Sequence, residues 1–169
     1  MSFSTVAVGG MDKTEVYRIL NEQLPLLLGE ERDFIANAAN TAALIFHTLP
    51  DLNWAGFYFF NGEELVVGPF QGKPACVRIA LGRGVCGAAA EKRETLVIPN
   101  VHEFADHIAC DSASNSEIVV PLIKNGRLIG VLDLDSPSFN RFDEQDRIEV
   151  ERAAKTFLEL TKFKYHDES

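Results

Sequence analysis

Residues 107–122, HIACDSASNSEIVVPL, contain the transition that decides the fold, because a polar segment changes there into an apolar run. Residues 110–117 include no strongly apolar side chain, whereas Ile118–Val120 begins a segment that must be buried. Cys110 and Glu117 therefore lie where an irregular loop enters a predicted strand. The stretch places a thiol and a carboxylate at the end of a sheet.

The segment that follows predicts a hairpin whose second strand carries two aspartates. Asn125-Gly126 is a typical two-residue turn, and residues 128–135, LIGVLDLD, return as a strand. Asp133 and Asp135 alternate along that strand and so share one face. Burial of carboxylates is unfavourable unless they are paired or protonated, so the pair indicates a functional site.

A single acid site requires an irregular register in this hairpin. With an uninterrupted two-residue turn, Lys124 would oppose Arg127 and Glu117 would oppose Leu134, on the face away from both aspartates. We therefore predict a three-residue loop, a bulge near Pro121, or a position for Glu117 just before the strand. Any of the three would bring the carboxylates together beside the thiol and the aromatic residue Trp54.

Length, charge and cysteine count restrict the class of protein. The 169 residues, 46% of them hydrophobic, fit one domain over 11–169 that follows a loose leader over 1–10. A net charge of -9 disfavours nucleic acid, and no apolar run approaches the roughly 20 residues of a membrane span. An odd number of cysteines, three, favours a reducing compartment, so we expect a cytoplasmic protein.

The rest of the pattern predicts helices and short strands. The expected helices are Thr14–Leu28, Arg32–Leu49, Ala88–Arg93 and Asp143–Phe163, and the other expected strands are Asn53–Phe60, Leu65–Phe70, Ala75–Leu81 and Thr95–Pro99. Hairpin connections with helices before and after predict an α+β domain, a six-stranded antiparallel sheet flanked by helices. This order of elements resembles the GAF fold, a ligand-binding module.

The aromatic strand Asn53–Phe60 has two different faces. Trp54 and Tyr58 share one face, and Phe57 and Phe59 share the other. One face must belong to the core, and the other either lines a pocket or is packed as well.

Residues 82–87, GRGVCG, match G-x-G-x-x-G between a strand and a helix. A dinucleotide site is disfavoured, because hairpins replace the strand-helix-strand alternation and no acidic residue ends a strand about 20 residues on. The position predicts instead that Cys86 is reactive, since a helix N-terminus favours a thiolate. No C-x-x-C pair is present, so we predict no metal, although His107, Cys110 and Cys86 could supply three ligands.

Clustered carboxylates beside a thiol favour redox chemistry. A thiolate can attack an electrophilic sulfur while a protonated carboxylic acid donates to the departing oxygen. Carboxylates at close range cannot all ionise, which raises at least one pKa. Acyl transfer of the Cys-His type is an alternative, but nothing marks a histidine as its base.

Seven blocks of sequence, in order, resemble the free methionine-(R)-sulfoxide reductases, which are stand-alone GAF-domain enzymes. The blocks are Asn53–Tyr58, Gly68–Lys73, Ala75-Cys76, Gly82–Gly87, His107–Asp111, Ser116–Pro121 and Gly130–Ser136. The resemblance extends over residues 14–160. It implies reduction of free L-methionine (R)-sulfoxide without a cofactor, with thioredoxin as the reductant.

The resemblance also implies a role for each matching residue. Cys110 would be the nucleophile, its sulfenic acid would condense with Cys76, and Cys86 would be an auxiliary thiol. The helix position alone favours Cys86 as the low-pKa thiol, and Asp111 disfavours a thiolate at its neighbour, so Cys86 stays an alternative partner. The substrate would contact an acidic cluster and an aromatic wall, formed by Glu117, Asp133, Asp135, Trp54 and Tyr58.

A non-enzymatic GAF sensor for a cyclic nucleotide or another small ligand is the competing class. Such a regulator is normally fused to an output domain, and 169 residues leave no room for one. NADPH consumption with thioredoxin, its reductase and methionine sulfoxide would separate the two. The sequence leaves the oligomeric state open, with a homodimer as one arrangement.

Overall fold

An antiparallel sheet with helices on both faces organises the molecule. The computed structural model describes residues 3–106 and 111–163. The helices are α1 (Lys13–Leu28), α2 (Phe34–Thr48), α3 (Gly84–Lys92) and α4 (Glu144–Glu159), with a 3-10 turn at Val101–Glu103. The strands are β1 (Trp54–Phe60), β2 (Glu64–Gly72), β3 (Arg78–Ala80), β4 (Leu96–Ile98), β5 (Ser116–Lys124) and β6 (Arg127–Ser136).

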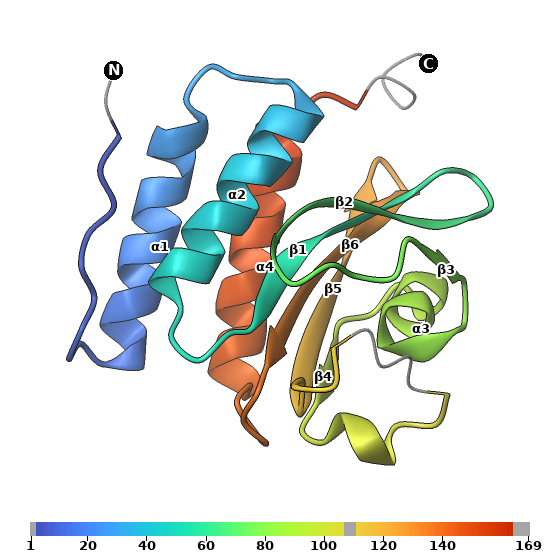
Figure 1. Ribbon diagram of the computed structural model, residues 1–169. Helices are drawn as coiled ribbons and strands as arrows, with labels where there is room; N and C mark the ends of the chain where they lie inside the picture. Colours follow the sequence, from blue (N-terminus) through green and yellow to red (C-terminus); the bar gives the residue numbers. More distant parts are fainter. Residues whose placement is uncertain (1–2, 107–110, 164–169) are drawn as a thin grey trace.

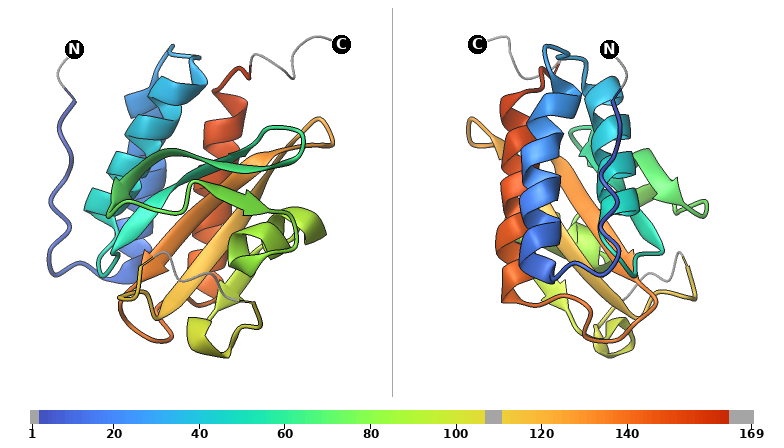
Figure 2. Two further views of the ribbon diagram at one scale, coloured as in Figure 1. Left: turned by 45° about the vertical axis from the view of Figure 1, so that its right-hand side comes forward. Right: turned by 90° about the vertical axis from the view of Figure 1, so that its left-hand side faces the viewer.

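The six strands form one sheet in the order β3-β2-β1-β6-β5-β4, and every neighbouring pair is antiparallel. Helices α1, α2 and α4 cover one face, and the short helix α3 lies on the other (Figure 1). Two further views show the three long helices on one side of the sheet and α3 on the other (Figure 2). The expected α+β class and the six-stranded antiparallel sheet are confirmed.

Side-chain alternation along the strands builds two hydrophobic clusters. On β1, Ala55 and Phe57 point to the three long helices, whereas Trp54 and Tyr58 belong to the cluster under α3. Phe157 of α4 contacts the Phe57 ring with 4.6 Å between centroids. The predicted difference between the two faces of β1 is therefore correct, and the α3 face is the one that can hold polar groups.

The long helices begin and end at recognisable signals. The Asp12 side chain accepts a hydrogen bond from the Glu15 amide at the start of α1, and Asp33 caps α2 in the same way. A reciprocal capping box joins Asp143 to Asp146 at the start of α4. No helix in the described part of the chain has the length and apolar character needed to cross a membrane.

Two expected boundaries are wrong around the glycine-rich segment. Strand β3 covers only Arg78–Ala80, so Cys76 lies in the loop before it and not inside a strand. Pro74 has no amide hydrogen, which prevents regular pairing of that loop. Helix α3 begins at Gly84 and not at Ala88.

The β5–β6 hairpin contains the predicted irregularity. Lys124 opposes Arg127, so the turn itself is the two-residue loop. The register then shifts between Leu122 and Ile123, because β6 contributes one extra residue and Leu122 opposes Gly130. The bulge thus lies next to Pro121, and its extra residue belongs to the partner strand.

The bulge determines which way Glu117 points. Glu117 opposes Asp135 directly, and Val119 opposes Asp133, so all three carboxylates share the face that carries α3. Without the shift, Glu117 would project into the apolar cluster under the long helices. The register prediction is confirmed.

Candidate functional site

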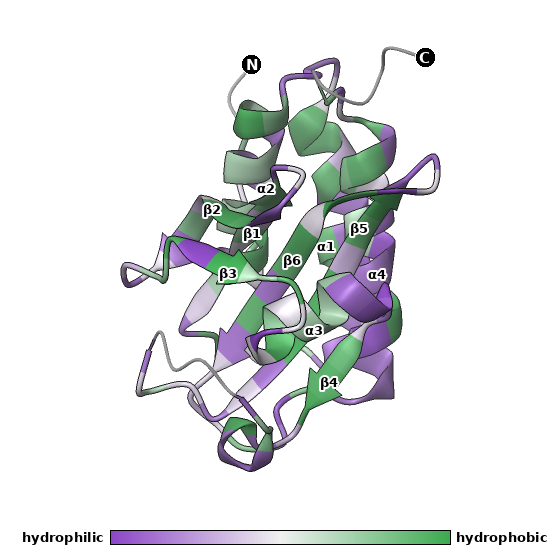
Figure 3. Ribbon diagram, turned by 90° about the vertical axis from the view of Figure 1, so that its right-hand side faces the viewer, coloured by the Kyte–Doolittle hydropathy of each residue, from purple (hydrophilic) through white to green (hydrophobic). Residues whose placement is uncertain are grey.

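A cavity between the sheet and α3 collects most of the residues singled out in the sequence. Its polar floor is Glu117, Asp133 and Asp135, and one wall is Trp54 and Tyr58. The first turn of α3 and the loop before β3 close two more sides. In the view onto this face, β6 changes from hydrophobic to hydrophilic as it runs beneath α3 (Figure 3). The cavity leaves about 40 Å³ for the centres of water molecules, enough for a few waters.

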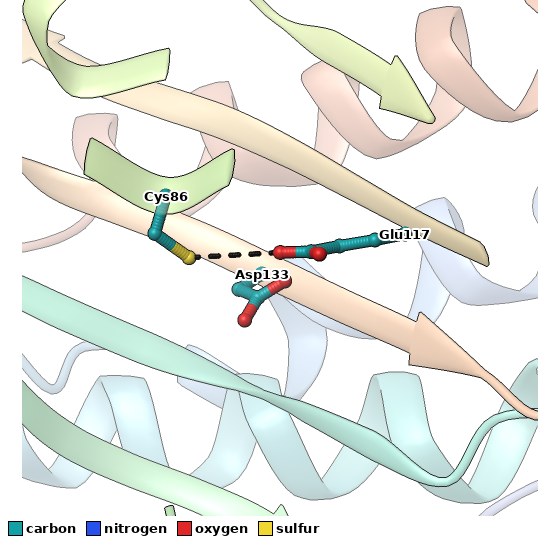
Figure 4. A group of neighbouring side chains, drawn as sticks. All are labelled: Cys86, Glu117 and Asp133. Carbon is teal, nitrogen blue, oxygen red and sulfur yellow. Dashed lines mark hydrogen bonds between the residues drawn. The ribbon is translucent and has the colours of Figure 1, made fainter. Parts of the chain in front are cut away.

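Three side chains from three different elements meet at the centre of this cavity. Cys86 of α3, Glu117 of β5 and Asp133 of β6 point toward one another (Figure 4), with their nearest ligand atoms all within 4.8 Å. The Cys86 thiol donates to Glu117 Oε1 at 3.8 Å. Glu117 is 6% exposed and Asp133 is 5% exposed, so these carboxyls are removed from bulk water.

Among residues 3–106 and 111–163, no basic side chain pairs with the acid cluster. In the described residues, none of the three carboxyls forms a salt bridge. Burial raises the pKa of Glu117 and of Asp135 well above the usual range, and the charge of Asp133 raises both further. Burial also raises the pKa of Asp133, to about 6. At neutral pH the cluster therefore holds protons, with Asp133 the first of the three to ionise.

The raised pKa of Asp133 predicts a pH-dependent stability difference. An unfolded Asp titrates near pH 4, so the group stabilises the fold below about pH 4, and this stabilisation is lost as pH rises through about 6. Asp133→Asn should therefore gain stability relative to the parent between pH 4 and pH 8, by up to about 3 kcal/mol. Urea unfolding at both pH values measures this change. An equal difference at both pH values would show that Asp133 ionises normally.

Cys86 does not behave as its position at a helix N-terminus predicts. It lies in the first turn of α3, but it is buried and faces carboxyl groups. Burial raises the pKa of the Cys86 thiol well above its usual range, and Asp133 and Glu117 raise it further. Desolvation and like charge outweigh the helix dipole here, so the expectation of a low-pKa thiol at Cys86 is wrong.

The aromatic wall is fixed by stacking and by two hydrogen bonds. The Trp54 ring stacks on Tyr58 at 5.8 Å and on Phe70 at 5.1 Å. Trp54 Nε1 donates to the Lys73 carbonyl at 3.2 Å, and the Tyr58 hydroxyl donates to the Cys76 carbonyl at 3.1 Å. The wall therefore also holds the loop that carries Cys76.

The three cysteines differ in state. Cys76 is half-buried and takes part in a disulfide bond, whereas Cys86 is a free thiol. Cys110 and His107 lie outside the described residues. The predicted convergence of the carboxylates on Trp54 is confirmed, and their placement beside Cys110 stays a prediction.

Asp111 and Ser114 also line the cavity, where neither was expected. Asn53 donates to Asp111 Oδ2 at 3.2 Å and to Ser114 Oγ at 3.0 Å, which ties the segment after Cys110 to the start of β1. A hydrogen bond from Ser114 lowers the pKa of Asp135, against the larger effect of burial. Long-range partners such as these leave no periodic signal in a sequence.

The cavity also contains basic groups at its rim. Lys73 and Arg83 both line it, and Lys73 Nζ lies 3.8 Å from Asp111 Oδ1. Arg83 belongs to the G-x-G-x-x-G segment, where it lies between Gly82 and Gly84.

One group of side chains has the spacing of metal ligands. Cys86, Glu117 and Asp133 offer one sulfur and two oxygens. This set differs from His107, Cys110 and Cys86, the set considered from the sequence. The absence of a resident metal stays a prediction.

Comparison with known proteins places this fold and cavity in a defined class. The family model for the GAF domain matches residues 20–157. That match spans all six strands and helix α3, and so includes the elements on both sides of the cavity.

Three relatives identify the family within the GAF-domain proteins. The free methionine-R-sulfoxide reductase of Escherichia coli is 54% identical over 80% of this chain and 82% of its own. The Saccharomyces cerevisiae protein of the same name is 40% identical over 91% and 90%. The Neisseria meningitidis enzyme, solved in complex with its substrate, is 43% identical over 94% of each chain, with a TM-score of 0.87. The chain belongs to the free methionine-R-sulfoxide reductase family of GAF-domain proteins.

Proposed function

We propose that this chain reduces free L-methionine (R)-sulfoxide to methionine by thiol chemistry. The observation that carries the proposal is the cavity itself, where a buried, proton-holding acid cluster faces an aromatic wall beside the disulfide-bonded Cys76. The sulfoxide group needs a proton donor, the S-methyl group needs an apolar wall, and the substrate ammonium needs an anion. The cavity contains all three, as protonated carboxyl groups, an aromatic wall and an ionisable carboxylate. The relatives named as free methionine-R-sulfoxide reductases support the same activity.

The different pKa values of Asp133 and Glu117 indicate different roles for the two carboxyl groups. Asp133 ionises first and has a buried Oδ1 without a hydrogen-bond partner among the described residues, so it is the carboxylate for the substrate ammonium. Glu117 retains its proton at neutral pH because burial and neighbouring charge raise its pKa, and it serves as the acid. Trp54 and Tyr58 contact the S-methyl end.

The first chemical step transfers the sulfoxide oxygen. The Cys110 thiolate attacks the sulfoxide sulfur while the Glu117 carboxylic acid protonates the oxygen, and collapse gives methionine and a sulfenic acid on Cys110. The sulfoxide gains two electrons, and the thiol loses two. No metal or organic cofactor enters this balance.

The second step converts the sulfenic acid into a disulfide that thioredoxin can reduce. The Cys76 thiol attacks the Cys110 sulfenic acid, releases water and forms a disulfide, which thioredoxin reduces by thiol exchange. The disulfide-bonded state of Cys76 supports this pairing, and so does the free thiol of Cys86. Cys86 is disfavoured as the partner, because its raised pKa slows attack. A reducing compartment such as the cytoplasm supplies the reductant.

A coupled assay tests the proposed activity. The purified chain is mixed with thioredoxin, thioredoxin reductase and NADPH, and then with the R or S epimer of free methionine sulfoxide. We expect one NADPH oxidised per methionine formed, with the R epimer only. Methionine sulfoxide that binds in calorimetry without any turnover would identify a ligand sensor instead of a reductase.

Trp54→Phe should mainly raise KM. The smaller ring keeps the stacking with Tyr58 and Phe70 but loses apolar contact with the substrate and the hydrogen bond to Lys73. The loss of binding should be about 1 to 3 kcal/mol, that is, roughly 5- to 150-fold in KM. Steady-state kinetics measures it. Trp54→Ala is less informative, because truncating a buried Trp costs about 3–5 kcal/mol of stability. An unchanged KM would make Trp54 purely structural.

Cys76→Ser should separate reduction of the substrate from recycling. Chemistry at Cys110 precedes disulfide formation, so the variant should release about one equivalent of methionine and then stall as the sulfenic acid. Quenched-flow analysis counts the methionine, and dimedone labelling traps the sulfenic acid. Loss of the first equivalent would give Cys76 a different role.

A further inference from the structure

The side of the cavity at the start of helix α3 is positive, whereas its floor is acidic. Helix α3 begins at its edge, and Arg83, Gly84, Val85 and Cys86 all line the cavity. Arg83 occupies the N-cap position, but no side chain caps the helix. The first amides of α3 therefore keep unused donors, with the positive end of the helix dipole at the cavity.

Arg83 adds a full positive charge at the same place. Its backbone is engaged, since its amide donates to Ala80 and its carbonyl accepts from Gly87. Its guanidinium is exposed and has no hydrogen-bond or ion-pair partner in the described part of the chain. Lys73, the other basic residue of the lining, lies near Asp111 and is 74% exposed. Of the described residues that line the cavity, Arg83 is the cation without a partner.

A buried group on the acid side gives an independent indication of a ligand. Asp133 is 5% exposed, and its Oδ1 has no hydrogen-bond partner among the described residues. An unpaired carboxylate oxygen facing a cavity points to a cationic ligand group. The acid floor and the start of α3 are also adjacent, because the Cys86 thiol contacts Glu117 at 3.8 Å. A ligand that carries an ammonium and a carboxylate on the same carbon, such as a free α-amino acid, has one group for the acid floor and one for the start of α3.

From this arrangement we infer that Arg83 binds the α-carboxylate of the substrate and makes the enzyme selective for the free amino acid. The inference rests on the proposed function, because it concerns the same substrate. Within a peptide, methionine sulfoxide has an amide in place of the carboxylate and cannot pair with the guanidinium. Arg83 is a specificity residue that does not take part in the oxygen transfer.

A substrate-variant cycle tests the inference. The substrates are L-methionine (R)-sulfoxide and its C-terminal carboxamide, and the proteins are the parent, Arg83→Ala, Arg83→Lys and Lys92→Ala. Lys92→Ala removes one exposed cation from the other end of α3 and serves as the control. We expect Arg83→Ala to lower kcat/KM about tenfold for the acid, through KM, and to leave the carboxamide unchanged. Arg83→Lys should recover part of the loss.

The outcomes are distinct. Equal losses with both substrates, or a similar loss in Lys92→Ala, would overturn the specificity role. Calorimetry of the same ligands keeps the test separate from turnover: if the parent binds the acid tenfold better than the carboxamide and Arg83→Ala does not, the inference holds even where no reduction occurs. Absence of both binding and turnover would contradict the inference together with the proposed function.

Discussion

The Cys110→Ser variant is expected to show no reduction of methionine sulfoxide, either over many turnovers or in the first one. A serine hydroxyl has too high a pKa to supply an anion at neutral pH, and oxygen is a poor nucleophile toward sulfoxide sulfur. The loss should exceed that of Cys76→Ser, which retains the first equivalent of methionine. Quenched reactions with excess enzyme measure methionine directly and do not depend on thioredoxin.

The same experiment decides between Cys110 and Cys86 as nucleophile. Full single-turnover activity in Cys110→Ser would move the attack to Cys86, against its burial and its raised pKa. Circular dichroism and a thiol titration confirm that the variant is folded. Mass spectrometry of the oxidised parent should find the Cys76–Cys110 disulfide, and a bond to Cys86 would change the order of resolution.

Most of the fold could be predicted from local signals. Period-3.6 patterns indicated α1, α2 and α4, and alternation with Asn-Gly turns indicated the hairpins. The need for an irregularity in β5–β6 also followed from the sequence, because three carboxylates on one face require one, and the structure shows that it is the bulge. Its location in β6 did not follow. The extra residue is Ile129, next to Gly130. A Cβ at Gly130 would lie 2.0 Å from the Tyr58 carbonyl oxygen of β1, but that contact appears only once the strands are paired.

The candidate site was predictable in its residues and less so in its electrostatics. Alternation along β1 and β6 brought Trp54, Tyr58, Asp133 and Asp135 to one face, as expected. The pKa of Cys86 was predicted in the wrong direction, because the helix position is a local signal whereas burial against two carboxyls arises from tertiary packing. The basic rim at Arg83 was missed for a related reason, since a single exposed arginine has no pattern.

Glu117→Gln should cause the second large loss of activity. Gln has nearly the same shape as Glu and keeps a polar group beside Cys86, but it cannot transfer a proton to the sulfoxide oxygen. General acid catalysis contributes about 10²- to 10⁴-fold, so we expect kcat to fall by at least about 10²-fold. KM should change little, because Asp133 still holds the substrate ammonium. Glu63→Gln, which removes an exposed carboxylate at the β1–β2 turn, is the matched control.

The pH dependence of kcat identifies Glu117 as an acid and not merely as a packing group. Its pKa is raised by burial and by Asp133 and Asp135, so the carboxyl is protonated and active at neutral pH and loses this role as pH rises through that value. The parent kcat should therefore fall on the alkaline side, while the residual kcat of Glu117→Gln should lack that limb. If the two profiles are parallel and kcat falls less than tenfold, another group supplies the proton, and Asp135, whose pKa is also raised, becomes the donor to test.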